Sequence, residues 1–218
     1  MTGRGRLGVV VVVTLAAAVP APWASGATAQ APSTTVGVVA GYAHNEQIWS
    51  RDVETEAVGG LVVGAWANVP TGAGWFSITA EGTYTQRGGD ATLDDEVVAG
   101  AGDTSPIRAD YITISVHPRA TARVGPVRIH LTTGPTLDQL VRSRLDPVLV
   151  PVLEDGTSTV FSWTAGVGIG GNVTSGVVAE AELRIVEGLG DAYSGPFISL
   201  RNRSIELVGR VGIPWPPN

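Results

Sequence analysis

The fold class of this chain is decided by the stretch Tyr111-Ile112-Thr113-Ile114-Ser115-Val116-His117-Pro118-Arg119-Ala120-Thr121-Ala122-Arg123. Every even position in it is apolar, and every odd position is polar or amphipathic. Strict alternation is typical of a β-strand, in which successive side chains point to opposite faces. An average strand of a soluble protein has only about 5–6 residues, whereas a strand that crosses a membrane needs roughly 9–11. The length of the stretch therefore favours a membrane-spanning strand.

Alternation of this kind returns along the chain and predicts eight strands of roughly ten residues each. The predicted strands are 36–42, 61–69, 76–85, 111–123, 127–138, 161–170, 177–185 and 204–213. The long connections between them are Ala43–Val58, Gly88–Ala109, Gln139–Thr159 and Gly188–Asn202, and the short ones are Pro70–Gly74, Val124–Pro126 and Asn172–Gly176. Long loops that alternate with short turns are typical of outer-membrane barrels. The sequence therefore predicts an all-β fold, an eight-stranded antiparallel up-and-down transmembrane β-barrel with long extracellular loops and both termini in the periplasm.

The two faces of the predicted strands differ in chemistry. The side chains expected to face lipid include Ile112, Ile114, Val116, Ile129 and Leu131. The charged side chains expected on the opposite, lumen face are Glu81, Arg119, Arg123, Arg128, Asp138, Glu180, Glu182, Arg184, Glu206 and Arg210. An eight-stranded barrel has an interior that side chains can fill, and charges buried there need partners. We therefore expect an ion-pair network that plugs the lumen; a narrow pore or a polar binding cavity with the same lining is the alternative.

Two prolines and a set of aromatic residues qualify this interpretation. Pro118 and Pro135 lie inside predicted strands and lack the N–H that a strand ladder uses, so we expect a bulge or local irregularity at each. Aromatic residues near strand ends are typical of the interface between a membrane and water. The aromatic residues in such positions are Tyr42, Trp66, Trp75, Phe76, Tyr84, Tyr111, Phe161 and Trp163.

The N-terminal segment has the pattern of an export signal. Arg4 and Arg6 precede the apolar run Leu7–Val19. The small-residue pattern Ala27-Thr28-Ala29 follows and predicts cleavage after Ala29. The apolar run is shorter than the ~20 residues that a membrane-spanning helix needs. We therefore expect a cleaved signal peptide at 1–29, a barrel domain at 30–218 and a location in the bacterial outer membrane.

The composition excludes several function classes. The 218 residues contain no Cys, and all 14 basic residues are Arg, so thiolate zinc sites, cysteine nucleophiles and Schiff-base lysines are absent from the sequence. The formal charge of −6 argues against nucleic acid as a partner. The acidic segment with Asp90, Asp94, Asp95, Glu96 and Asp103 lacks the spacing of a known calcium loop. We expect no metal and no cofactor.

Two other functions remain as alternatives to a structural or binding barrel without catalytic activity. Ser115, His117 and His130 lie on the predicted lumen face, and with an acidic residue they would provide the groups of an outer-membrane lipid hydrolase. A soluble lipocalin-like barrel that carries a small apolar ligand would show the same alternation with its faces reversed. The polar face here is rich in Ser, Thr and Gly, which favours a crowded lumen.

Several segments resemble the outer-membrane β-barrel domain proteins of the PorT-like family, over about Val36 to Trp215. The segments that carry the resemblance are Gly59-Gly60-Leu61-Val62-Val63-Gly64, Ala80-Glu81-Gly82-Thr83-Tyr84-Thr85-Gln86-Arg87-Gly88, Tyr111-Ile112-Thr113-Ile114 and Thr133-Gly134-Pro135-Thr136-Leu137. The resemblance implies a barrel with no catalytic residues. We expect a monomer whose partners are outer-membrane lipid and the barrel-insertion machinery. Barrels of this class usually end on an aromatic residue, whereas Trp215 is followed by Pro216-Pro217-Asn218 here. No ligand for the loops follows from the sequence.

Overall fold

The computed structural model describes residues 33–51, 53–92, 104–150, 153, 156–174, 176–196 and 198–216. All of them lie within the compact unit Ala31–Asn218. The predicted signal peptide at 1–29 lies outside the described residues. Within the described ranges, no helix is long and apolar enough to cross a membrane.

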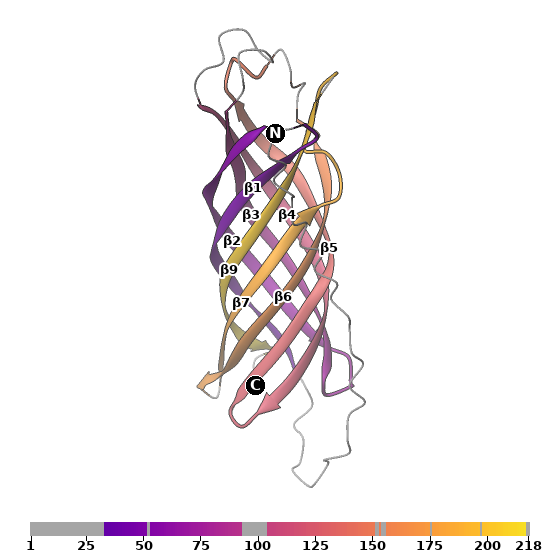
Figure 1. The fold of residues 1–218 in the computed structure, drawn as a ribbon. Helices are drawn as coiled ribbons and strands as arrows, with labels where there is room; N and C mark the ends of the chain where they lie inside the picture. Colours follow the sequence, from indigo (N-terminus) through magenta and orange to yellow (C-terminus); the bar gives the residue numbers. More distant parts are fainter. Residues whose placement is uncertain are drawn as a thin grey trace, which may run out of the picture. The chain divides into compact units, whose positions relative to one another are not determined.

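The described residues form one antiparallel β-sheet that closes on itself. Its strands are β1 (Thr34–Trp49), β2 (Glu54–Pro70), β3 (Phe76–Thr92), β4 (Thr104–Val124), β5 (Val127–Leu145), β6 (Thr159–Thr174), β7 (Val177–Gly188), β8 (Tyr193–Ser194) and β9 (Ser199–Trp215). Neighbours in the sequence pair with each other, and β1 also pairs with β9, which closes the ring. Figure 1 shows the long strands inclined to the barrel axis and winding around it. The predicted antiparallel up-and-down barrel is confirmed.

The sheet has nine strands, whereas the sequence predicted eight. The additional strand, β8, has two residues and pairs only with β9, through Tyr193 opposite Leu200 and Ser194 opposite Ser199. The wall of the barrel consists of β1 to β7 and β9. Hydrophobic alternation could not reveal β8, because two residues are too few to repeat a pattern.

The two ends of the barrel differ in their connections. The short connections 71–75, 125–126 and 175–176 lie at one end, where β1 begins beside the end of β9; we call this the turn end and the opposite end the loop end. The predicted long connection Ala43–Val58 is wrong, because β1 continues to Trp49 and β2 begins at Glu54. The other predicted long connections are also shorter, because strand pairing continues beyond the alternating segments. The wall strands consequently have 12 to 21 residues.

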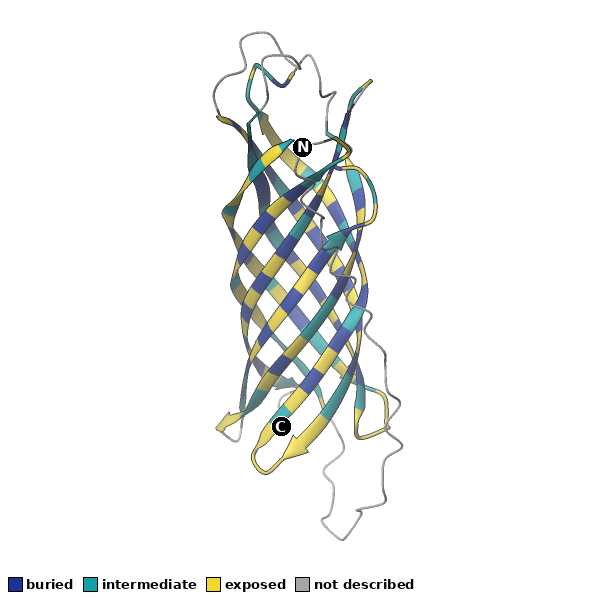
Figure 2. Ribbon diagram, viewed as in Figure 1, coloured by how far each residue is buried: buried dark blue, intermediate teal, exposed yellow. Residues whose placement is uncertain are grey.

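Buried and exposed side chains alternate along the wall strands, as Figure 2 shows. The five residues predicted to face lipid all point outward, with exposed fractions from 40 % at Ile129 to 58 % at Leu131. The inward positions of the same strands are buried and polar, among them Thr113 and Thr132. The barrel is thus apolar outside and polar inside, which is the reverse of a soluble protein.

Two aromatic side chains differ from their predicted place. Trp66 is 3 % exposed and Tyr111 is fully buried, so both lie inside the barrel instead of in an outer aromatic belt. Tyr42, Trp75 and Phe161 are exposed on the outside. Aromatic residues are common in strands on either face, and proximity to a strand end does not determine which face they occupy.

Pro118 and Pro135 share a single interruption of the strand ladder and cause no bulge. Pairing between β4 and β5 stops after Ser115 and resumes at Arg119 without a change in register. Both prolines lie within this gap, where no N–H donor is needed from either of them. The predicted bulge or local irregularity is therefore present at both prolines, in the form of an interruption of pairing.

We expect the replacement of Gly64 by alanine to destabilise the barrel and the same replacement of Gly82 to be tolerated. A Cβ atom at Gly64 would lie 2.1 Å from the carbonyl oxygen of Gly82 on the neighbouring strand, whereas one at Gly82 would have nothing within 4 Å. Overpacking of this kind costs about 1–3 kcal/mol. Urea titration of the folded barrel in detergent measures both free energies of unfolding. Equal stability of the two variants would contradict the close approach of β2 and β3.

Candidate functional site

The centre of the barrel interior contains the carboxylate of Glu81 on β3 between the guanidinium groups of Arg184 on β7 and Arg210 on β9. Arg184 Nη1 donates to Glu81 Oε2 over 2.7 Å, and Arg210 Nε donates to Glu81 Oε1 over 2.7 Å. Arg210 Nη2 donates to the same Oε1. β3 lies across the ring from β7 and β9, so these bonds cross the lumen.

Two further carboxylates complete the partners of these arginines. Arg184 Nε donates to Glu206 Oε2 over 2.7 Å, and Ser204 donates its hydroxyl to the other oxygen of Glu206 over 3.1 Å. Arg210 Nη1 donates to Glu182 Oε2 over 3.0 Å. Each of the two buried guanidinium groups therefore contacts two carboxylates.

His130 on β5 connects this cluster to a second ion pair. Arg119 donates to both oxygens of Glu180, over 2.8 and 2.7 Å. Arg119 Nη2 also lies 3.0 Å from His130 Nδ1, and His130 Nε2 lies 3.0 Å from Glu182 Oε2. A guanidinium group has no acceptor, so Nδ1 accepts from Arg119 and Nε2–H donates to Glu182. This arrangement requires the neutral imidazole.

Hydrogen bonds thus connect eight buried side chains of β3, β4, β5, β7 and β9, which we call the central network. Its members are Glu81, Arg119, His130, Glu180, Glu182, Arg184, Glu206 and Arg210. All are at most 8 % exposed. Charges removed from water in this way need close partners, because an unpaired buried charge costs about 3–5 kcal/mol.

The alternation of β7 and the glycines of β6 explain how the network is assembled. Glu180, Glu182 and Arg184 are two residues apart and share the inner face of β7, and Arg184 lies directly opposite Glu206 on β9. The inner face of β6 carries glycine at three alternate positions. A Cβ atom at Gly168 would lie 2.3 Å from His130 Nε2, so the missing side chains provide the room that the network occupies.

A separate ion pair, outside the central network, lies nearer the loop end. Arg87 Nη2 donates to Asp138 Oδ1 and Arg87 Nη1 contacts Asp138 Oδ2, both over 3.1 Å. Thr113 and Ser162 donate their hydroxyls to Asp138 over 2.6 and 2.8 Å. The Arg87 guanidinium carbon also lies 5.8 Å from the centre of the Tyr111 ring. Every acceptor oxygen of Asp138 therefore has a donor.

Arg87 was missed by the sequence analysis. The predicted strand ended at Thr85, two residues before Arg87. The signal was present, because Arg87 continues the two-residue period of Glu81, Thr83 and Thr85 on the inner face of β3. Continuing the alternation to the end of β3 would have found it.

The structure places eight of the ten predicted lumen charges in the interior and leaves two outside it. The eight are seven members of the central network and Asp138. Arg123 is exposed and Arg128 is half-buried, and both lie at the turn end, where Arg128 donates to the side chain of Asn172 over 3.1 Å. The period-2 pattern gives the face of a residue but not its height in the barrel, which is why it grouped Arg123 and Arg128 with the others.

A small cavity of about 10 Å³ separates the central network from the Arg87–Asp138 pair. Hydroxyl groups line much of it, and His117 also borders it. Both ring nitrogens of His117 are buried without a hydrogen-bond partner. The predicted Ser115–His117–acid arrangement of a hydrolase is therefore not assembled, since a catalytic histidine must contact both its serine and its acid.

One side of the interior is apolar. Val39, Ala43, Val62, Trp66 and Val208 form a buried cluster contributed by β1, β2 and β9. The Trp66 ring packs against Arg210, whose guanidinium carbon lies 6.0 Å from the ring centre. These side chains fill the space beside the central network. Among the described residues, the interior thus contains no apolar cavity of the ~300 Å³ or more that a lipocalin-like carrier needs.

The loop end is closed by a separate hydrophobic cluster. The cluster consists of Ile107, Leu149, Leu153, Val160, Ala192, Tyr193, Ile198 and Leu200. Tyr193 of β8 shares a hydrogen bond of 2.7 Å with the Ser143 hydroxyl, and burial raises the pKa of Tyr193. β8 therefore contributes to a packed cap above the end of the barrel wall.

Most of the predicted acidic segment lies outside the described residues. Asp94, Asp95, Glu96 and Asp103 lie outside the described residues. Asp90 belongs to β3 and forms an ion pair of 2.5 Å with Arg108 of β4. No group of three or more His, Asp or Glu side chains arranged for a metal ion occurs in the part of the chain that the structure describes.

We expect Glu81→Gln to destabilise the barrel strongly and Glu46→Gln to have little effect. The Glu81 carboxylate is a counter-charge for two buried arginines. Its neutralisation removes that counter-charge and should lower the free energy of unfolding by about 3–5 kcal/mol. Glu46 is exposed on the outer face of β1. The Glu46→Gln substitution removes the same charge as Glu81→Gln and serves as the control. The midpoint of the heat-modifiability transition measures both effects. Equal midpoints for the two variants would mean that the central network contributes no stability.

Comparison with solved structures shows a similar fold in the outer membrane protein OprG from Pseudomonas aeruginosa. The two structures align with a TM-score of 0.55 and 6 % sequence identity, over 82 % of this chain and 95 % of OprG. Two structures of Ail, the attachment invasion locus protein of Yersinia pestis, also match. The first, in complex with the heparin analogue sucrose octasulfate, has a TM-score of 0.40 and 13 % identity over 83 % of this chain and 99 % of Ail. The second has a TM-score of 0.35 and 12 % identity over the same shares of the two chains.

No family model and no curated protein matches the chain. The resemblance to the PorT-like family therefore stays a prediction. At 6 % identity, the likeness to OprG concerns the fold, and no functional residue can be transferred from it. The chain has the fold of an outer-membrane β-barrel.

Proposed function

We propose that this protein is a bacterial outer-membrane β-barrel whose lumen is closed by the central network and which acts as a structural or binding element at its loop end. Three features support the membrane location: the predicted export signal, the barrel fold and the apolar outer surface. Outer-membrane lipid and the barrel-insertion machinery are the partners that this proposal requires, and the resemblance to PorT-like barrels agrees with it.

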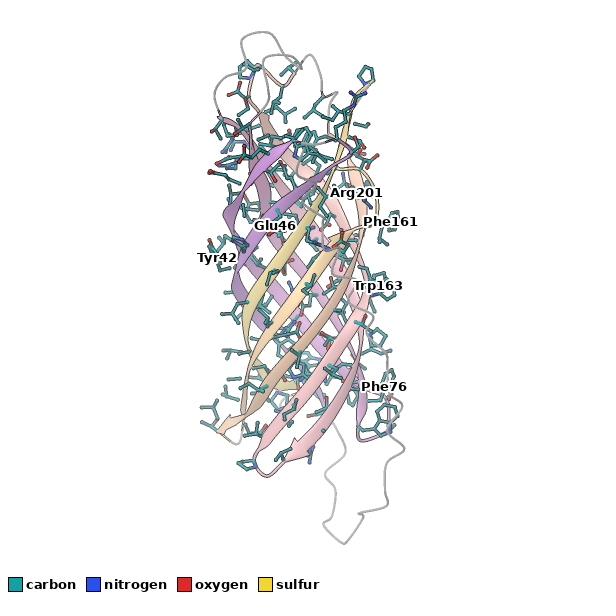
Figure 3. The ribbon with its side chains drawn as sticks, viewed as in Figure 1. Tyr42, Glu46, Phe76, Phe161, Trp163 and Arg201 are labelled. Carbon is teal, nitrogen blue, oxygen red and sulfur yellow. The ribbon has the colours of Figure 1, made fainter. Side chains whose placement is uncertain are left out.

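The observation that carries the proposal is the distribution of polarity between the two faces of the wall. Large apolar side chains are exposed on every wall strand, whereas the charged members of the central network are buried. Exposed apolar surface on this scale is unfavourable in water and is favourable against lipid tails. Figure 3 shows Tyr42, Phe161 and Trp163 on the outer surface, with Phe76 nearer the turn end. Aromatic residues at two levels are typical of the two membrane interfaces.

The filled interior favours a closed barrel over a pore. Bonds from Glu81 to Arg184 and Arg210 cross the lumen, and Trp66 and its apolar neighbours occupy the remaining side. The cavity above the central network has a volume of about 10 Å³, which is close to the space that a single water molecule requires. Solute transport through the lumen would require the network to come apart.

The loop end is where a binding role would be located. A hollow of about 300 Å³ lies there beside β8, with Trp49, Asp191 and Arg201 among its lining residues. An aromatic ring with charges of both signs could recognise an amphipathic or polar ligand. The interior offers no comparable opening among the residues that the structure describes, and we therefore propose no enzymatic activity for the lumen.

Reconstitution of the purified chain in planar bilayers tests this proposal. We expect the wild-type protein to insert without steady conductance, because the central network fills the lumen. The charge-balanced double variant E81A/R210A removes the contact that crosses the lumen and keeps the Arg184–Glu206 and His130–Glu182 contacts. It should conduct ions. Flotation with liposomes and resistance to carbonate extraction verify insertion of both proteins.

The same measurements contain the outcomes that would contradict the proposal. Steady single-channel current from the wild-type protein would show that the lumen is open. Recovery of the wild-type protein from the soluble fraction after flotation would contradict the membrane location.

A further inference from the structure

Two arginines at the turn end lie directly opposite each other without a carboxylate partner. Arg123 of β4 pairs in register with Arg128 of β5, at the last but one position before the turn. Like charges at directly opposed positions of a sheet repel each other and destabilise the pair. Arg128 donates to the Asn172 amide oxygen, and Arg123 makes no side-chain hydrogen bond or ion pair within the described residues. Most of the donors of the two guanidinium groups are therefore available to a ligand.

The surrounding sequence supplies no acidic side chain to compensate these charges. The strand segments at the turn end lie within 57–80, 111–137, 156–179 and 207–216, and none of these contains Asp or Glu. The acid closest along the neighbouring strands is Glu180, which lies opposite Gly170, the partner of Arg128. Both oxygens of Glu180 already accept from Arg119. The carboxylate that acts on Arg128 is thus already bound to Arg119, and the turn end presents two positive charges without an ion-pair partner of their own.

The apolar residues beside this pair indicate where it lies relative to a membrane. Val124 and Val127 follow and precede the two arginines at the tip of the same hairpin and are 62 % and 41 % exposed. Val173 and Trp75 are also exposed at this end of the barrel. Exposed apolar side chains at a turn suit the boundary of a bilayer better than open water. The valines lie on the outer face of the hairpin, whereas the two arginines share the inner face with Arg119 and His130 and therefore lie at the rim of the lumen, beside that boundary.

We propose that Arg123 and Arg128 form a binding site for a phosphate group at the turn end of the barrel. The inference rests on the proposed membrane location. Guanidinium groups bind phosphate through paired N–H donors, and two of them side by side match the several oxygens of one phosphate group. The phosphate belongs either to a lipid headgroup of the periplasmic leaflet or to a free phosphate in the periplasm.

Titration calorimetry on the full chain, folded in neutral detergent micelles, tests the site. The probes are a short-chain phosphatidylglycerol, a diacylglycerol of the same chain length without phosphate, and inorganic phosphate. We expect wild-type protein to bind the phosphatidylglycerol and the R123Q/R128Q variant to bind it at least about tenfold more weakly, since charge-assisted hydrogen bonds of ordinary strength correspond to such a factor. The control variant R142Q/R144Q removes the same charge from exposed positions of β5 at the loop end and should keep wild-type affinity.

The probes distinguish the two sources of phosphate and include the outcomes that overturn the site. Inorganic phosphate that binds and displaces the lipid would support the site with free phosphate as its ligand, and lipid binding alone would support the headgroup. Equal affinity of wild type and R123Q/R128Q, or equal binding of the diacylglycerol, would overturn the proposal. If R123Q/R128Q fails to give a heat-modifiable band, the single variants at these exposed or half-exposed positions replace it. The binding assay uses micelles and does not depend on insertion into a bilayer. Failure of the folded protein to stay with membranes would therefore contradict the proposed function and leave the binding result unchanged.

Discussion

The rest of the structure depends on the contact of Glu81 with Arg184 and Arg210 across the lumen. A ring of eight wall strands with an apolar exterior must place its polar side chains inside, where they lose water. Charges in that position are tolerated only when each has close partners. Glu81 is a partner of both arginines at once, and Arg184 and Arg210 also form ion pairs with Glu206 and Glu182, respectively. The closed lumen that we propose, and the stability that we expect of the barrel, both rest on this arrangement.

The fold could be predicted from the sequence because one physical rule acts along the whole wall. The alternation of Ile112, Thr113 and Ile114 shows which side chains point away from the barrel interior. The same rule applies wherever one face of a strand is apolar and the other is polar. The ends of the strands could not be predicted, because beyond the apolar band both faces become polar and the pattern fades while the pairing continues. β1 and β2 consequently extend into a connection that was expected to be a long loop, and β3 continues beyond Thr85 to Thr92.

The partners within the interior could not be derived from the sequence. Alternation placed Arg119 and Arg123 on the same face of β4, but only Arg119 is deep enough to contact Glu180. Pairing across the lumen depends on the tilt and register of the closed ring, which bring β3 opposite β7. The two ends also differ in a way that only the structure shows: a hydrophobic cap that includes Tyr193 closes the loop end, whereas unpaired arginines mark the turn end. A barrel anchored by one end and exposed for recognition at the other is consistent with both.

The central claim, an apolar exterior around a closed polar interior, is tested most directly by nitroxide scanning of β4 in lipid bilayers. The chain contains no cysteine, so a single cysteine can be introduced at each position from 112 to 117 and labelled in turn. Collision rates with oxygen, which concentrates in the bilayer, and with a water-soluble nickel chelate then report the surroundings of each label. We expect high oxygen and low nickel accessibility at Ile112, Ile114 and Val116, and low accessibility to both at the buried positions 113, 115 and 117. High nickel accessibility at the buried positions would show a water-filled lumen and contradict this account.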